Sequence, residues 1–137
     1  MDLIIEKAFI QVLQDTLGVT PIRTDNKLLK GYLSRIDVVF ENGMQTTITF
    51  VSAKEFLGVI GEGLFGESSD DDLELRDLSR ELANLTAGLA KVLAIKENMH
   101  FNIATPITFG FGEFQDTQNR CINFSLEGAL CSLFLYS

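Results

Sequence analysis

One long segment with helical periodicity, flanked on both sides by strand-like segments, constrains the fold more than any other feature. Residues 71–98 carry apolar side chains at spacings of three and four, which is typical of an amphipathic helix. On a helical wheel these side chains fill a stripe roughly 100° wide. We expect this stripe to be buried against the rest of the protein. Its members are Leu75, Leu78, Leu82, Leu85, Leu89 and Val92.

The flanking segments predict an antiparallel sheet. Residues 31–40 and 44–51 alternate apolar and polar side chains on either side of Asn42-Gly43, a dipeptide typical of tight hairpin turns. Further strands are expected at residues 19–23, 103–111, 119–126 and 129–135, and further helices at residues 3–16 and 53–64. The order predicts an α+β fold with an antiparallel sheet of about six strands and helices packed on one face. Each half is a helix followed by three strands, so we expect two pseudo-repeats.

The bulk properties indicate a single domain and exclude several classes of partner. The chain has 137 residues, the size of one ordinary domain covering residues 1–137. Its net charge of −8 argues against binding to nucleic acid or to an anionic membrane surface. The first residues lack the basic stretch of a signal peptide, and no apolar run reaches the roughly 20 residues that span a bilayer. We therefore expect a cytoplasmic protein.

The two cysteines, Cys121 and Cys131, have the pattern of ordinary structural residues. If Glu127-Gly128 forms a hairpin turn, Cys121 pairs near Phe134 and Cys131 near Phe124, which keeps the two sulfurs far apart along the ladder. We expect both thiols to be reduced, since the paired spacing of a zinc site is missing.

The loop at residues 66–72 is rich in Ser and Asp but lacks the ligand spacing of a calcium loop. We expect these residues to cap the long helix, and we expect no metal site.

Beside the apolar stripe, the long helix carries a second set of side chains that we call the polar ridge: Asp77, Glu81, Asn84 and Gly88. These four positions share an arc of about 60°, centred about 110° from the stripe. In one interpretation, the ridge is a solvated flank and Gly88 serves internal packing. In the other, the ridge is a binding surface and Gly88 lets a partner approach closely, which would explain a residue that costs roughly 1 kcal/mol in mid-helix. Spacing alone names no reaction.

The segment 77–91, DLSRELANLTAGLAK, resembles the signature of the CheC, CheX and FliY family. That signature is an Asp or Ser, a Glu four residues later, an Asn three residues after that, and then a Gly four residues on. Residues 103–110 are similar to the proline-containing strand that follows the signature helix, and the element order fits nearly the whole chain. Proteins of this family remove the phosphoryl group from CheY-type response regulators.

CheC-like members carry the signature twice. In the first predicted helix Asp2 and Glu6 keep the spacing, but Phe9 replaces the asparagine and Leu13 the glycine. A phenylalanine cannot orient a water by hydrogen bonding, so we expect this copy to be inactive. A single copy resembles CheX, whose relatives are typically homodimers. No segment resembling the flagellar-motor part of FliY follows residue 137, so we expect a CheX-like chain.

The resemblance implies a chemotaxis phosphatase that hydrolyses the aspartyl phosphate of a phosphorylated CheY-type response regulator. Glu81 and Asn84 would be the catalytic residues: Asn84 orients the attacking water and Glu81 docks to the partner's active-site lysine. Asp77 and Gly88 would bind the partner. The protein would need no cofactor of its own, because the response regulator brings Mg²⁺. An alternative with the same fold is a non-catalytic adaptor that binds a receiver domain or a flagellar motor component.

Overall fold

The computed structural model describes residues 1–68, 70–117 and 119–137, and within these ranges one helix is followed by three strands, two helices and four strands. The helices within these ranges are α1 (Asp2–Leu17), α2 (Lys54–Phe65) and α3 (Asp72–Ile95). The strands are β1 (Ile22–Arg23), β2 (Lys30–Phe40), β3 (Gln45–Ser52), β4 (Phe101–Ile103), β5 (Ile107–Glu113), β6 (Arg120–Leu126) and β7 (Ala129–Tyr136). In the described residues no helix combines the length and the apolar character needed to cross a membrane.

All paired strands are antiparallel and form one sheet in the order β1-β6-β7-β3-β2, with both β4 and β5 pairing with β2. The strands of the two halves correspond: β1 matches β5, β2 matches β6 and β3 matches β7. Each half has the same pairings, because β2 lies between β3 and β5 just as β6 lies between β7 and β1. The two halves therefore match as helix-plus-three-strand repeats, which confirms that prediction. α2 lies between the repeats in the sequence.

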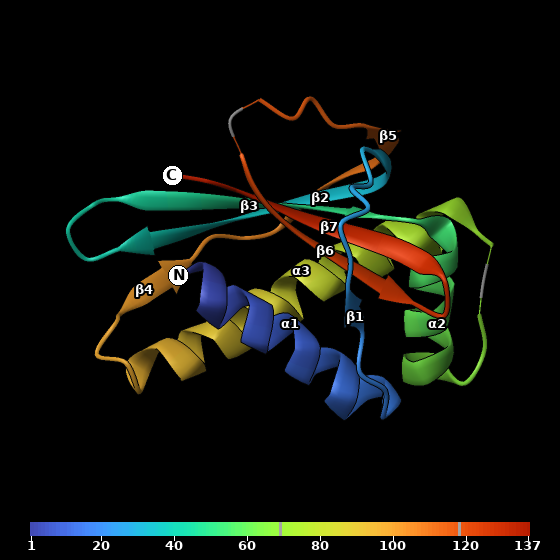
Figure 1. Ribbon diagram of the computed structural model, residues 1–137, viewed down its shortest axis with the longest axis horizontal. Helices are drawn as coiled ribbons and strands as arrows, with labels where there is room; N and C mark the ends of the chain where they lie inside the picture. Colours follow the sequence, from blue (N-terminus) through green and yellow to red (C-terminus); the bar gives the residue numbers. More distant parts are fainter. Residues whose placement is uncertain (69, 118) are drawn as a thin grey trace.

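The three helices lie on one face of the sheet, as predicted (Figure 1). Phe9 of α1 joins the layers, because its ring stacks on Phe56 of α2 and on Phe124 of β6 and also contacts Phe50 of β3. All four rings are fully buried. The core of the protein is therefore the space between the sheet and the helices, and the outer side of α3 is left for other contacts.

Among the residues that the structure describes, the sheet has seven strands rather than about six, because the strand predicted at residues 103–111 is divided. β4 pairs with Val38–Phe40 and β5 with Lys30–Arg35, two different parts of β2. Pro106 lies in the gap and has no backbone N–H to donate to a ladder, so the strand cannot run through it.

The last hairpin has the predicted register. Glu127 and Gly128 both adopt positive φ angles, of 52° and 83°, which two-residue hairpin turns of this kind require. Cys121 pairs with Phe134 and Cys131 with Phe124, and both thiols are free. Burial raises the pKa of the Cys131 thiol to about 12, so this sulfur stays protonated and unreactive at neutral pH.

Candidate functional site

The N-terminal end of α3 is held in place by contacts with the preceding loop and with β2. The carboxylate of Asp71 accepts a hydrogen bond from the Glu74 backbone N–H at 3.4 Å, which confirms the predicted capping by the acidic loop. Ser69, which belongs to that loop, lies outside the described residues. The Tyr32 hydroxyl of β2 donates to Asp72 at 2.9 Å, and Asp72 also forms an ion pair with Arg76. Burial, and then the contact with Asp72, raises the pKa of Tyr32, so its hydroxyl remains a donor.

The buried side of α3 differs from the predicted stripe toward the C-terminal end. Leu75, Leu78 and Leu82 are buried as expected, but Leu85 and Leu89 are only half-buried and Val92 is 54% exposed. The prediction for Val92 is wrong, because the buried side rotates toward smaller residues. Those residues are Ala83, Thr86, Ala87, Ala90 and Ala94. α1 lies against α3, and small side chains on the buried side permit such close packing (Figure 1).

The polar ridge is on the surface. Glu81 and Asn84 are exposed, and neither side chain has a hydrogen-bond or ion-pair partner among the residues that the structure describes. Asp77 is exposed too and forms an ion pair with Arg80 at 3.3 Å. The α3 backbone thus presents one carboxylate and one carboxamide, three residues apart, to the solvent. The amide of Asn84 can both donate and accept hydrogen bonds.

Gly88 is not required by packing inside the protein. A Cβ built at this position meets no atom within 4 Å. The interpretation that Gly88 serves internal packing is therefore wrong, and the space above the glycine is open to an approaching surface.

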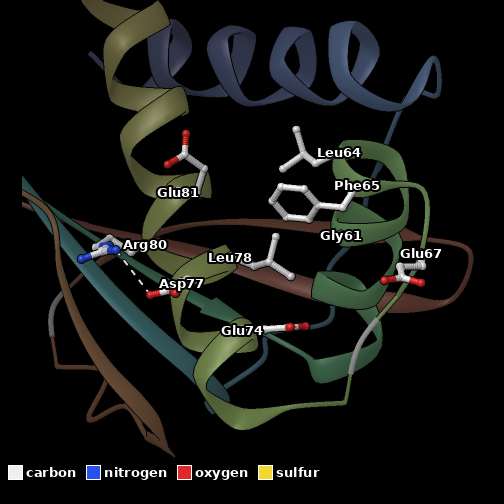
Figure 2. A pocket seen from close by; sticks show the side chains of 9 residues that line it. All are labelled: Gly61, Leu64, Phe65, Glu67, Glu74, Asp77, Leu78, Arg80 and Glu81. Carbon is white, nitrogen blue, oxygen red and sulfur yellow. Dashed lines mark hydrogen bonds and ion pairs between the residues drawn. The ribbon is translucent and has the colours of Figure 1, made fainter.

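An open cleft of about 540 Å³ lies between α2 and α3 and adjoins the ridge. Asp77 and Glu81 belong both to the ridge and to the cleft, whereas Asn84 and Gly88 lie further along α3. Figure 2 shows Glu81 on α3 and Phe65 on α2 at the same end of the cleft, with Leu78 between the helices. The sequence patterns do not predict this cleft; its signal in the sequence is the adjacent pair Leu64-Phe65 at the end of a short helix, just before Gly66.

The first helix holds no comparable surface. Asp2 and Glu6 form ion pairs with Arg120 and Arg23, respectively. Phe9 and Leu13 are fully buried in the core. The positions that match the asparagine and the glycine of the signature therefore lie in the core rather than in the solvent.

No protein-family model and no curated protein sequence matches the chain, whereas solved structures do. CheX from Vibrio vulnificus superposes with a TM-score of 0.82 at 15% identity, over 96% of this chain and 95% of that chain. CheX from Desulfovibrio desulfuricans gives 0.77 at 19% identity, over 98% and 96% of the two chains. The CheX–CheY–BeF3–Mg²⁺ complex from Borrelia burgdorferi gives 0.71 at 19% identity, over 98% and 95%.

These likenesses and the sheet order define the class: an α+β domain of two related halves, with the exposed ridge on the helix of the second half. The fold is that of the CheX and CheC-like chemotaxis proteins. The resemblance inferred from the α3 signature is thereby confirmed at the level of the fold.

Proposed function

We propose that this protein is a CheX-like member of the CheC, CheX and FliY family and hydrolyses the aspartyl phosphate of a CheY-type response regulator. One observation carries the proposal: Glu81 and Asn84 are exposed and unpartnered among the described residues, on a helix whose other side is core. They occupy the signature positions in a chain with the CheX fold. A solved CheX with this fold binds CheY in the complex from Borrelia burgdorferi, which supports the class of partner.

Hydrolysis of an aspartyl phosphate requires little catalytic machinery from the phosphatase. An aspartyl phosphate is a mixed anhydride that already hydrolyses by itself, and the response regulator holds both the phosphoryl group and Mg²⁺. A water attacks phosphorus, the bond from phosphorus to the aspartyl oxygen breaks, and the carboxylate leaves. The protein contributes by holding that water in line, so its role is positioning rather than covalent catalysis.

The two ridge residues divide this work. The Asn84 amide accepts one hydrogen bond from the water with its carbonyl oxygen and can donate another with its NH2 group. The side chain has no useful pKa, so it orients the water and is not a general base. Glu81, about one turn earlier, pairs with a lysine of the receiver by a charge-assisted contact, which fixes the register of the inserted helix. Asp77 lies at the edge of the same surface.

Two measurements on one panel of receivers test the proposal and separate it from the adaptor alternative. Each candidate receiver is phosphorylated, and its rate of phosphate release is measured with and without the protein. Binding of the same receivers, loaded with beryllofluoride and Mg²⁺, is measured in parallel. A phosphatase binds and accelerates release. A chain that binds a receiver without accelerating release is an adaptor, and the catalytic proposal is then wrong.

Gly88→Ala should make the protein more stable but less active. The free energy of unfolding should rise by about 1 kcal/mol, since alanine is the better helix former and the new methyl meets no atom. Receiver dephosphorylation should fall by about tenfold, because the methyl intrudes where the partner closes in. Gly58→Ala is the matched control, since Gly58 is a mid-helix glycine of α2 with only an ordinary contact at 3.9 Å. If both variants gain stability and keep full activity, Gly88 has no role in partner approach.

We further propose a homodimer that forms through strand pairing at β5. This strand pairs only with β2 among the described elements, and it exposes about half of Ile107, Phe109 and Phe111. An apolar edge of this kind is open to pairing with a second copy. Light scattering at micromolar concentration should give twice 15.2 kDa for the wild type. Phe109→Lys should give 15.2 kDa and Met44→Lys, an exposed control, should not; a monomeric wild type would contradict the proposal.

A further inference from the structure

The cleft between α2 and α3 continues the surface that holds Glu81. Its lining comes from the end of α2, the following loop and the first turns of α3, and consists of Gly61, Leu64, Phe65, Glu67, Glu74, Asp77, Leu78, Arg80 and Glu81 (Figure 2). Because Glu81 is at once a wall of the cleft and a member of the polar ridge, a partner that covers Glu81 also meets the mouth of the cleft.

The interior of the cleft is apolar. Phe65 is 71% exposed and Leu64 37% exposed, whereas Leu78 is 4% exposed and forms the floor. Gly61 brings the helices together at that floor, since a Cβ there would lie 3.0 Å from a Leu78 methyl. A large aromatic ring left in water next to a cleft is typical of a binding surface, and aromatic anchors contribute much of the affinity at protein interfaces.

The rim of the cleft is acidic. Four carboxylates surround the apolar side chains: Glu67, Glu74, Asp77 and Glu81. Arg80 forms an ion pair with Asp77, and in the described part of the chain the other three acids have no ion pair. Figure 2 places Glu74 and Glu67 on the side away from the Arg80–Asp77 pair. The cleft therefore combines an aromatic anchor with an unbalanced negative potential.

We propose that this cleft is a second docking site for the same receiver domain, and that it holds an apolar side chain flanked by Lys or Arg. This inference rests on the proposed function, because it takes its partner from the adjoining ridge. Charge selects this occupant. A second copy of this chain carries a net charge of −8 and would bring acid to an acidic rim, whereas a basic and apolar segment matches both parts of the cleft.

Phe65→Ala tests the apolar part. The substitution should weaken binding of the beryllofluoride- and Mg²⁺-loaded receiver by about tenfold and raise KM similarly, while kcat stays unchanged, because Phe65 binds the partner away from the reacting atoms. Folding is not at risk, since the ring is mostly in solvent. Met44→Ala is the control: Met44 is 64% exposed, in the β2–β3 turn at the end of the molecule opposite α2 (Figure 1).

A double charge substitution tests the rim. Glu67→Gln with Glu74→Gln should slow association with the receiver and flatten its dependence on salt, since two charges that steer the encounter are lost. Glu41→Gln with Glu97→Gln removes the same net charge from exposed positions outside the cleft and should leave both quantities near the wild-type values.

The outcomes separate this inference from the proposed function. Wild-type affinity in Phe65→Ala, beside slow release in Asn84→Ala, overturns the docking site and leaves the phosphatase intact. If Phe65→Ala weakens receiver binding but the wild type never accelerates phosphate release, the docking site is supported and the catalytic proposal is wrong. If Phe65→Ala changes the mass in solution rather than receiver affinity, the cleft is a contact between copies and the inference is wrong. A wild type that binds no receiver overturns both.

Discussion

Asn84→Ala should slow phosphate release from a phosphorylated receiver by about 10²–10³-fold, the usual scale for losing one positioned hydrogen-bonding group in an active site. Binding of the receiver should stay nearly intact. The amide is small, and Glu81 remains in place to hold the register of the helix. Asn84 is exposed and unpartnered in the described residues, so its removal leaves no buried group unsatisfied and should not unfold the protein.

Single-turnover release, measured beside binding to a receiver that is trapped with beryllofluoride, separates these two effects. Glu81→Ala provides the contrast, because the loss of a charge-assisted contact should weaken binding as well as turnover. Wild-type rates in both variants would leave the polar ridge as ordinary solvated surface.

Phe9→Asn should destabilise the protein severely and create no second site. Phe9 is fully buried and contacts the rings of Phe50, Phe56 and Phe124. Truncation of a buried phenylalanine costs about 3–5 kcal/mol, and an unpaired amide in its place adds about 1–3 kcal/mol. This sum is a large part of the roughly 5–15 kcal/mol that keeps a domain folded.

Urea unfolding gives the free-energy change for Phe9→Asn. Phe9→Leu is the matched control, since it keeps an apolar side chain of similar size and should cost much less. If Phe9→Asn unfolds at the wild-type urea concentration, the ring cluster is not the junction between helices and sheet. If it also gains phosphatase activity, α1 carries a latent copy of the site after all.

The fold and the ridge could be predicted because they depend on periodicity. The alternation in β2 and β3 and the tight turn at Glu127-Gly128 fix which strands pair and in which register. Helical geometry places Glu81 and Asn84 on one side of α3, away from Leu75 and Leu78. This holds regardless of which elements pack against the leucines.

The remaining features depend on contacts between segments that are distant in sequence. Val92 continues the leucine pattern, but α1 packs beside α3 and turns the buried side toward the alanines, which leaves Val92 in solvent one turn beyond Gly88. Phe9 fits the spacing of a signature copy, and only the tertiary structure shows that this position faces the sheet. The cleft needs α2 and α3 to meet at Gly61 and Leu78, which no local pattern encodes.

A crystal structure of this protein bound to a receiver loaded with Mg²⁺ and beryllofluoride, which stands in for the phosphoryl group, would show where the polar ridge lies in the complex. We expect α3 to enter the receiver's active site, with the Asn84 amide on the side of the beryllofluoride opposite the aspartate and Glu81 beside the receiver's active-site lysine. A receiver docked on another face, with Asn84 left in solvent, would contradict this expectation.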